Sequence, residues 1–166
     1  MHRTHPNAHH DIELRLFSED DRASCQRIAA LAALSSYGPR MPELRGRFVE
    51  TQPLEPADER IVAIRGGTVA GFLDLVGSHV SNLFVDPRLQ GKGIGTALMA
   101  EVARRVVGDL TLSVFTLNPD ARRLYERLGF QIEGVKTVPF AGSSAEVWIM
   151  RKPRPGKWSS GDTPEG

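Results

Sequence analysis

Residues 83–99 read Leu-Phe-Val-Asp-Pro-Arg-Leu-Gln-Gly-Lys-Gly-Ile-Gly-Thr-Ala-Leu-Met, and this is the most informative part of the sequence. An apolar strand ends at Asp86-Pro87, and a glycine-rich loop then opens directly into a helix. Backbone N–H groups in the first turn of a helix have no internal partner and lie at the positive end of the helix dipole. Glycines at 91, 93 and 95 keep side chains away from the main chain and permit a positive φ. The stretch therefore predicts a loop that binds a diphosphate.

Two other nucleotide-binding loops fit these residues poorly. A Walker loop needs Lys followed by Ser or Thr, whereas Lys92 is followed by Gly93. The dinucleotide fingerprint Gly-x-Gly-x-x-Gly fails in both registers, because its third glycine would be Thr96 or Leu98. An ordinary strand-to-helix connection stays open as the alternative.

A second segment, residues 118–130, reads Asn-Pro-Asp-Ala-Arg-Arg-Leu-Tyr-Glu-Arg-Leu-Gly-Phe and predicts a helix with defined ends. Asn118 suits the N-cap, Pro119 the first helical position and Gly129 a left-handed C-terminal residue. Tyr125 lies on the apolar face of this helix, so its hydroxyl needs a polar partner, which a ligand would supply.

Together the two segments resemble motifs A and B of the GNAT superfamily, the acetyl-CoA-dependent N-acyltransferases. The first carries Gln90-x-x-Gly93-x-Gly95, and the second carries Asn-x-x-Ala-x-x-Leu-Tyr-x-x-x-Gly-Phe over 118–130. The resemblance extends over roughly residues 11–152. It implies an α/β fold with a central mixed, mostly antiparallel sheet of about seven strands, flanked by about four helices.

The resemblance also implies which residues bind acetyl-CoA and take part in transfer. The main chain of Leu83 and Val85 would bind pantetheine, with the Val85 N–H polarising the thioester carbonyl. Tyr125 would protonate or hydrogen-bond the leaving thiolate. The cofactor-binding set is Leu83, Phe84, Val85, Gln90, Gly91, Lys92, Gly93, Ile94, Gly95, Thr96, Asn118, Arg122 and Tyr125.

His79 is the candidate general base. It occupies a position where many relatives place Glu, and an imidazole with a pKa near 6.5 accepts a proton at neutral pH. Strand alternation predicts that His79 shares a face with Ser81, Leu83 and Val85. A structural histidine is the alternative, and Asp74 and Glu146 are reserve candidates for the base.

Hydrophobic periodicity predicts seven strands and four helices. Helices are expected from Ser18 to about Gly38, around 44–49, from Ile94 to about Val107, and over 119–128. The expected strands are 12–17, 59–65, 68–76, 79–85, 110–117, 130–138 and 145–152.

Composition limits the remaining function classes. With 166 residues, one acetyltransferase domain over 11–152 is expected, between a flexible arm at 1–10 and a disordered tail at 153–166. The 21 basic and 20 acidic residues nearly cancel, so neither nucleic acid nor membrane is an expected partner. Cys25 is the sole cysteine, which suits the cytoplasm, and we expect it to be buried and inert rather than an acyl carrier. The histidines at 2, 5, 9 and 10 predict a solvated arm and no metal site.

The sequence thus favours an N-acetyltransferase that acts in a ternary complex on the amine of a small molecule, amino acid or peptide. A catalytically silent CoA-binding sensor and a protein-interaction domain are the alternatives. The acceptor is expected between the loops 37–47 and 137–144, and a homodimer is compatible with the chain.

Overall fold

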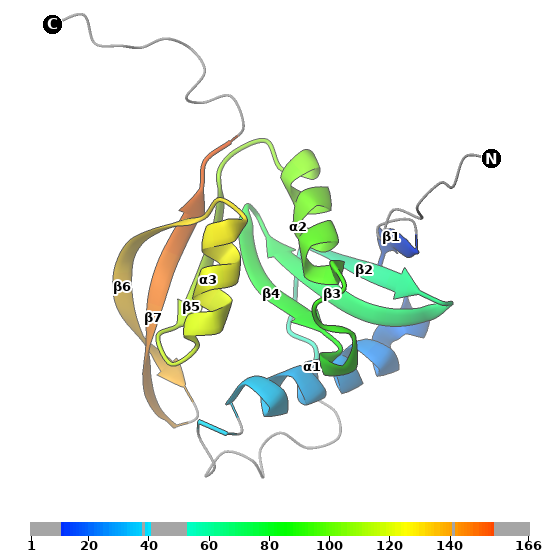
Figure 1. Ribbon diagram of the computed structural model, residues 1–166, viewed down its shortest axis with the longest axis horizontal. Coiled ribbons are helices and arrows are strands. Elements are labelled where there is room, and N and C mark those ends of the chain that lie inside the picture. Colours follow the sequence, from blue (N-terminus) through cyan, green and yellow to red (C-terminus); the bar gives the residue numbers. More distant parts are fainter. Residues whose placement is uncertain (1–10, 38, 41–52, 141, 155–166) are drawn as a thin grey trace, which may run out of the picture. The chain divides into compact units, whose positions relative to one another are not determined.

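The computed structural model describes residues 11–37, 39–40, 53–140 and 142–154 (Figure 1). The chain divides into two compact units, 1–102 and 103–166, with the boundary in the last turn of helix α2 (Ile94–Arg105). Within the described ranges, no helix has both the length and the apolar character that crossing a membrane requires.

In the described part of the first unit, four antiparallel strands follow the order β1-β2-β3-β4. Their bounds are β1 Ile12–Leu16, β2 Glu59–Arg65, β3 Thr68–Val76 and β4 His79–Val85. The turn between β2 and β3 is Gly66-Gly67, and both glycines have a positive φ, +59° and +78°. Two consecutive left-handed residues give the hairpin turn whose twist matches the flanking strands, as the glycine pair predicts.

Helices α1 (Arg22–Tyr37) and α2 pack against opposite faces of this four-stranded sheet. Cys25 and Ile28 of α1 are buried against Phe72, and Phe84 packs on the same cluster. Ile94 of α2 approaches the other face, at Gly71, where an added Cβ would lie 3.2 Å from its side chain and 2.7 Å from the Phe84 carbonyl oxygen. Because side chains alternate along a strand, residues 71 and 72 face opposite sides.

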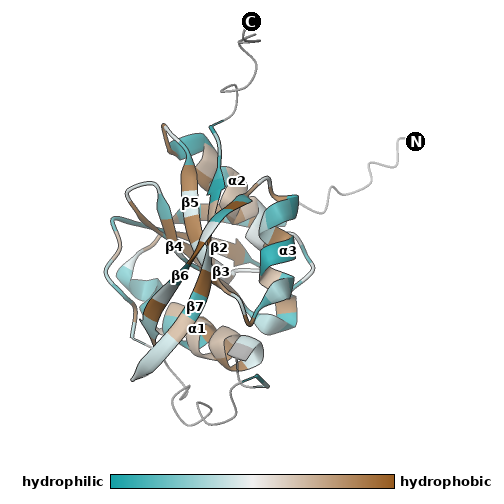
Figure 2. Ribbon diagram, turned by 90° about the vertical axis from the view of Figure 1, so that its left-hand side faces the viewer, coloured by the Kyte–Doolittle hydropathy of each residue, from teal (hydrophilic) through white to brown (hydrophobic). Residues whose placement is uncertain are grey.

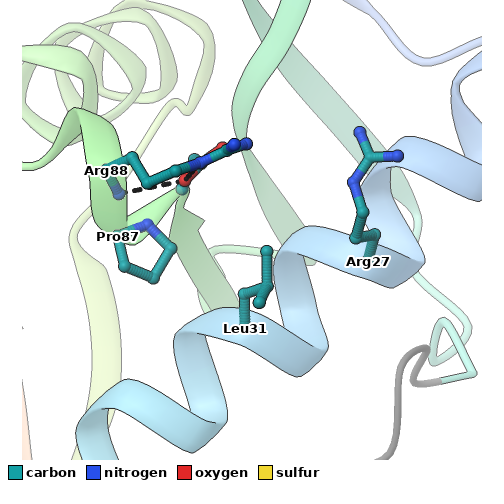
Figure 3. Close-up of a pocket in the computed structure, with 5 residues that line it drawn as sticks. Arg27, Leu31, Pro87 and Arg88 are labelled. Atoms are coloured by element: carbon teal, nitrogen blue, oxygen red, sulfur yellow. Dashed lines mark hydrogen bonds and ion pairs between the residues drawn. The ribbon is translucent and has the colours of Figure 1, made fainter.

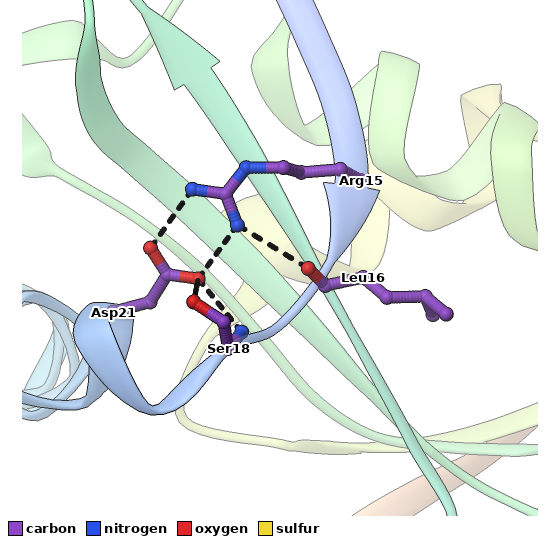
Figure 4. Close-up of polar contacts among 4 residues, drawn as sticks. All are labelled: Arg15, Leu16, Ser18 and Asp21. Carbon is purple, nitrogen blue, oxygen red and sulfur yellow. Dashed lines mark hydrogen bonds and ion pairs between the residues drawn. The ribbon is translucent and has the colours of Figure 1, made fainter.

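A buried carboxylate joins β1 to the start of α1 (Figure 4). Asp21, in the 3₁₀ turn η1 (Glu19–Asp21), accepts hydrogen bonds from both terminal nitrogens of Arg15 at 2.7 and 2.9 Å. It also accepts one from the Ser18 N–H at 2.9 Å. These hydrogen bonds, above all those from Arg15, lower the pKa of Asp21.

A second buried ion pair lies between β2 and β3. The Asp74 carboxylate accepts from Arg60 Nε at 2.6 Å and from Arg60 NH2 at 3.0 Å, and the Asn82 side chain donates to it at 3.1 Å. The Arg60 guanidinium also stacks over the rings of Phe17 and Phe72. Asp74 is 1% exposed, so this network belongs to the core of the first unit.

The described residues of the second unit form a three-stranded antiparallel sheet and one complete helix. Its strand order is β5-β7-β6, with β5 Leu110–Phe115, β6 Gln131–Phe140 and β7 Ser143–Lys152. Helix α3 (Pro119–Arg127) joins β5 to β6, and Figure 2 shows hydrophilic residues over much of it. None of its residues is fully buried.

The α/β class and all seven predicted strands are confirmed, with shifts of a few residues at some ends. Strand β5 ends at Phe115, two residues early, because the chain turns there and the Asn118 N–H donates to the Phe115 carbonyl. The predicted helix at 44–49 lies outside the described residues, as do 1–10 and 155–166. The predicted domain limits therefore stay predictions.

Candidate active site

The glycine-rich loop takes the backbone conformation that its sequence predicts. Gly91 has φ +77° and Gly93 has φ +82°, while Gly95 lies inside the first turn of α2. An added Cβ at Gly91 would meet no atom within 4 Å, so the main chain there borders open space. Lys92 and Gln90 are exposed beside it. These left-handed glycines turn the loop and leave its backbone accessible to a ligand.

The start of α2 presents three backbone donors. The Ala97 N–H donates to the Gly93 carbonyl at 2.9 Å, which is the first hydrogen bond of the helix. The N–H groups of the preceding residues, 94 to 96, therefore have no helical acceptor. The Ile94 side chain is 1% exposed and anchors this turn to the sheet. A diphosphate fits this arrangement, because it would accept several of these N–H groups at the positive end of the helix dipole.

The backbone of β4 directs two predicted residues away from β3. The Asp86 N–H donates to the Ala70 carbonyl at 2.9 Å, and Val85 is paired with Gly71. In an antiparallel ladder, hydrogen-bonded and non-hydrogen-bonded pairs alternate, so the N–H and C=O of Val85 and of Leu83 point away from β3. Their side chains lie on the α2 face, since a Cβ on Gly95 would contact both. The backbone groups of Leu83 and Val85 are thus directed where an extended amide chain such as pantetheine could accept and donate hydrogen bonds.

The predicted face of His79 is wrong, because β4 contains a β-bulge. Asn82 pairs with Asp74 and Val80 pairs with Leu75, which leaves Ser81 as the extra residue. The bulge reverses the alternation, so His79 pairs with Val76 and lies on the face opposite to the side chains of Leu83 and Val85. A register slip between strands cannot be read from one strand's sequence.

The surroundings of His79 favour its neutral form. The residue is half-buried, and this burial lowers the pKa of the imidazole below its usual value of 6.5. Asp74, a reserve candidate, has both carboxylate oxygens occupied by Arg60 and Asn82, which argues against a role as base. Glu146 is exposed on β7.

In the second unit, α3 has the ends that its sequence predicts. The Asn118 side-chain oxygen accepts a hydrogen bond from the Ala121 N–H at 3.2 Å and so caps the helix. The NH₂ group of Asn118 takes no part in this cap and can donate to other partners. At the other end, Phe130 N–H donates to the Tyr125 carbonyl and Gly129 N–H to the Glu126 carbonyl, with Gly129 at φ +97°. The half-buried Tyr125 ring contacts Phe130 edge to face, 5.9 Å between centroids.

An arginine on a helix of charged residues is usually solvated, but the Arg122 side chain makes two specific contacts. Its guanidinium lies over the Trp148 ring of β7, 4.8 Å from the centroid. The Nε atom lies 2.8 Å from a Glu126 carboxylate oxygen. Both contacts fix the side chain. The pair with Glu126, four residues further on, can be read from the sequence of α3, whereas the contact with Trp148, 26 residues further along the chain, cannot.

Cys25 is buried, as expected. It is 0% exposed in the core of the first unit, and burial raises the pKa of its thiol to about 12. A protonated thiol without access to solvent is a poor nucleophile. This environment argues against a role for Cys25 as an acyl carrier.

The site residues therefore form two groups. Leu83 to Val85 and the loop 90–96 adjoin in the first unit, and Asn118, Arg122 and Tyr125 share α3 in the second. Of the predicted acceptor loops, residues 41–52 lie outside the described chain. In the other range, 137–144, the Phe140 ring at the end of β6 contacts the Phe115 ring at a tilt of 58°, with 4.8 Å between centroids.

Comparison with known proteins identifies the family. Residues 56–132 match a family model described as an acetyltransferase (GNAT) domain. The N-alpha-acetyltransferase RimI of Mycobacterium tuberculosis is 32% identical over 142 residues, which cover 79% of this chain and 87% of RimI. The peptidyl-lysine N-acetyltransferase YjaB of Salmonella typhimurium is 32% identical over 112 residues, 65% of this chain and 70% of YjaB.

A solved structure shows the same fold. The PaiA N-acetyltransferase of Thermoplasma acidophilum, crystallised with coenzyme A, superposes with a TM-score of 0.60 at 20% identity, covering 86% of this chain and 98% of that one. The chain belongs to the GNAT family of acetyltransferases. The fold and the enzyme class predicted from the two motifs are thereby confirmed.

Proposed function

We propose that this protein transfers the acetyl group of acetyl-CoA to a primary amine by direct attack in a ternary complex. The observation that carries the proposal is the junction of β4 with the glycine-rich loop. There the backbone of Leu83 and Val85 faces away from β3, and the first N–H groups of α2 lack helical acceptors. These two features suit an amide chain and a diphosphate, which are consecutive parts of coenzyme A.

In this proposal, each residue of the predicted set has a role in binding coenzyme A, except Tyr125, which acts on the thiolate as described below. Gly91, Lys92, Gly93, Ile94, Gly95 and Thr96 surround the diphosphate, with Gln90 at its entrance. Leu83, Phe84 and Val85 bind pantetheine through the main chain, and Asn118 offers its NH₂ group to the same arm. The fixed guanidinium of Arg122 is available to the nucleotide phosphates.

The acceptor amine attacks the thioester carbon as a neutral nucleophile, and the carbon–sulfur bond breaks. His79 removes the surplus proton from the amine, directly or through water, and Tyr125 donates a proton to the departing thiolate. The products are an amide and coenzyme A. The acceptor class includes peptide amines; this part of the proposal is supported by the relatives named above, a peptidyl-lysine N-acetyltransferase and an N-alpha-acetyltransferase. A homodimer and a cytoplasmic location stay predictions.

The proposal is tested by measuring coenzyme A binding and acetyl transfer to a panel of amines. Calorimetry with coenzyme A should show saturable binding to the full chain, and mass spectrometry should detect the acetylated amine. Replacing Tyr125 with Phe removes the proton donor but keeps the ring contact with Phe130, so transfer should fall by about 10² with coenzyme A affinity unchanged. Phe130→Leu is the control: it removes the ring that Tyr125 contacts, so it measures how much transfer is lost through altered packing alone.

Two results would contradict this assignment. An unchanged rate in Tyr125→Phe would remove the tyrosine as the acid. Tight coenzyme A binding without transfer to any amine would instead support a CoA-binding sensor, the alternative that His79 in place of Glu suggests.

A further inference from the structure

A pocket of about 520 Å³ lies in the first unit between α1 and the 3₁₀ turn η3 (Pro87–Leu89) (Figure 3). It is lined by Arg27, Leu31, Asp86, Pro87 and Arg88. Arg27 and Leu31 are four residues apart on α1 and therefore project from the same side of the helix, toward the turn. The pocket combines two guanidinium groups and one carboxylate with apolar surface from Leu31 and Pro87.

The charge of Asp86 is already balanced within the turn. Its carboxylate accepts from the Arg88 N–H at 3.0 Å, from Arg88 Nε at 3.1 Å and from Arg88 NH2 at 2.7 Å. Asp86 is 4% exposed, and this double contact fixes the direction of the Arg88 side chain, which runs from the turn toward Arg27. These hydrogen bonds also lower the pKa of Asp86, so the pair stays ionised at neutral pH.

Arg27, the second cation of the pocket, has no such partner among the described residues. In the part of the chain that the structure describes, Arg27 makes no hydrogen bond or ion pair, and it acts on Asp86 only as a nearby charge. The pocket therefore carries one positive charge in excess. Arginine binds carboxylate and phosphate groups through two parallel N–H groups, so such a group held by Arg27 and lying near Arg88 would balance this excess.

The pocket is separate from the proposed coenzyme site. It includes α1, which covers the face of Phe72 and Phe84, whereas the start of α2 covers the face of Gly71. We infer that this pocket binds the carboxylate or phosphate group of a small molecule other than coenzyme A. That molecule is either an acidic acceptor amine or a separate effector, and the two share the same recognition chemistry.

Inorganic phosphate is the probe, titrated calorimetrically into the full chain saturated with coenzyme A, so that the loop at 91–96 is occupied. The wild type should bind phosphate saturably. Arg27→Gln removes the unpaired guanidinium from an exposed position and should weaken phosphate binding roughly tenfold. Arg65→Gln, which removes the same charge at the end of β2, is the matched control and should bind like the wild type.

A second pair of variants tests the pocket without deleting an arginine. Leu31→Glu places a carboxylate beside Arg27 and should abolish phosphate binding, whereas Leu34→Glu, equally exposed on α1, should not. Equal weakening in Arg27→Gln and Arg65→Gln, or absence of saturable binding in the wild type, would overturn the inference.

Steady-state kinetics then distinguish whether the acceptor amine or a separate effector carries the bound carboxylate or phosphate. If the acceptor carries it, Arg27→Gln should raise KM for amines that bear a carboxylate and leave KM for neutral amines unchanged. If an effector carries it, KM should stay the same for both classes while phosphate still binds. Should the protein fail to bind coenzyme A, the proposed function fails, but the titrations of unliganded wild type, Arg27→Gln and Arg65→Gln still decide the inference.

Discussion

His79 is the side chain whose proposed role depends most directly on pH. Burial lowers the pKa of its imidazole, so the neutral, proton-accepting form persists to a pH below 6.5. As a base, His79 makes kcat/KM rise with pH through that lowered pKa and then level off. His79→Gln should remove this acidic limb. A pH profile that keeps its acidic limb in the variant would assign the proton transfer to another group.

Asp74 should contribute to stability rather than to catalysis. Its removal leaves the Arg60 guanidinium, whose side chain is 10% exposed, as an uncompensated buried charge. Asp74→Ala should therefore lower the free energy of unfolding by about 3–5 kcal/mol. Urea denaturation measures this loss.

The matched control for Asp74→Ala is Asp120→Ala, which breaks an ion pair with Arg123 whose side chains are 74% and 58% exposed. An exposed pair contributes at most about 1 kcal/mol. Similar losses of unfolding free energy in the two variants would show that the buried Arg60–Asp74 pair stabilises the protein no more than an exposed pair does.

At the scale of single elements, two glycines near the start of α2 should respond in opposite ways to the same substitution. Gly71→Ala forces a Cβ to within 2.7 Å of the Phe84 carbonyl oxygen, and backbone cannot move aside easily. Unfolding free energy should fall by about 2 kcal/mol or more. At Gly95, the new Cβ would lie 3.7 Å from Val85, an ordinary contact, and alanine favours the helix by up to about 1 kcal/mol.

Thermal unfolding of the two glycine variants checks this difference. Gly95→Ala should match or exceed the wild type, and Gly71→Ala should unfold at a clearly lower temperature. Equal destabilisation in both would mean that α2 does not pack against β3 as described.

The elements that local signals define were predictable, and those that depend on contacts between strands were not. Asn118 and Gly129 mark the ends of α3 by side-chain and backbone chemistry that involves only neighbouring residues. The bulge at Ser81 and the stacking of Arg122 on Trp148 depend on the register of another strand. Sequence periodicity carries no information about that register, so the face of His79 and the surroundings of Arg122 required the structure.

The pocket between α1 and η3 combines both cases. The Asp86-Pro87-Arg88 turn is a local signal, because Asp before Pro accepts from the backbone two residues on. Arg27 has no such signal, since it is one of several arginines in the chain and gains its setting only when α1 packs on the sheet. The sequence could therefore indicate the turn but not the pocket.

At the scale of the whole molecule, coenzyme A should raise the temperature of unfolding. A ligand that binds only the folded state adds about 2.7 kcal/mol at a concentration of 100 Kd. For a chain of this length, that corresponds to a rise of about 5–10 °C in Tm. Differential scanning calorimetry at increasing coenzyme A concentrations measures it.

Gly91→Asp is the control for this rise, because its new side chain points into open space but places a negative charge beside the proposed diphosphate. Because residue 91 has φ +77°, any side chain there strains the backbone, so Gly91→Asp should have a somewhat lower Tm than the wild type without ligand. Its Tm should rise little on addition of coenzyme A. A full shift in Gly91→Asp would argue that the diphosphate binds away from the loop.

The enclosed cysteine also determines how turnover can be followed. Since Cys25 is the sole cysteine and is shielded from solvent in the native state, a colorimetric disulfide reagent has no reactive sulfur on the folded protein. In such an assay, all colour formed in native samples comes from the released cosubstrate. One additional equivalent per chain would appear only on denaturation, so a single cuvette reports both catalysis and loss of structure.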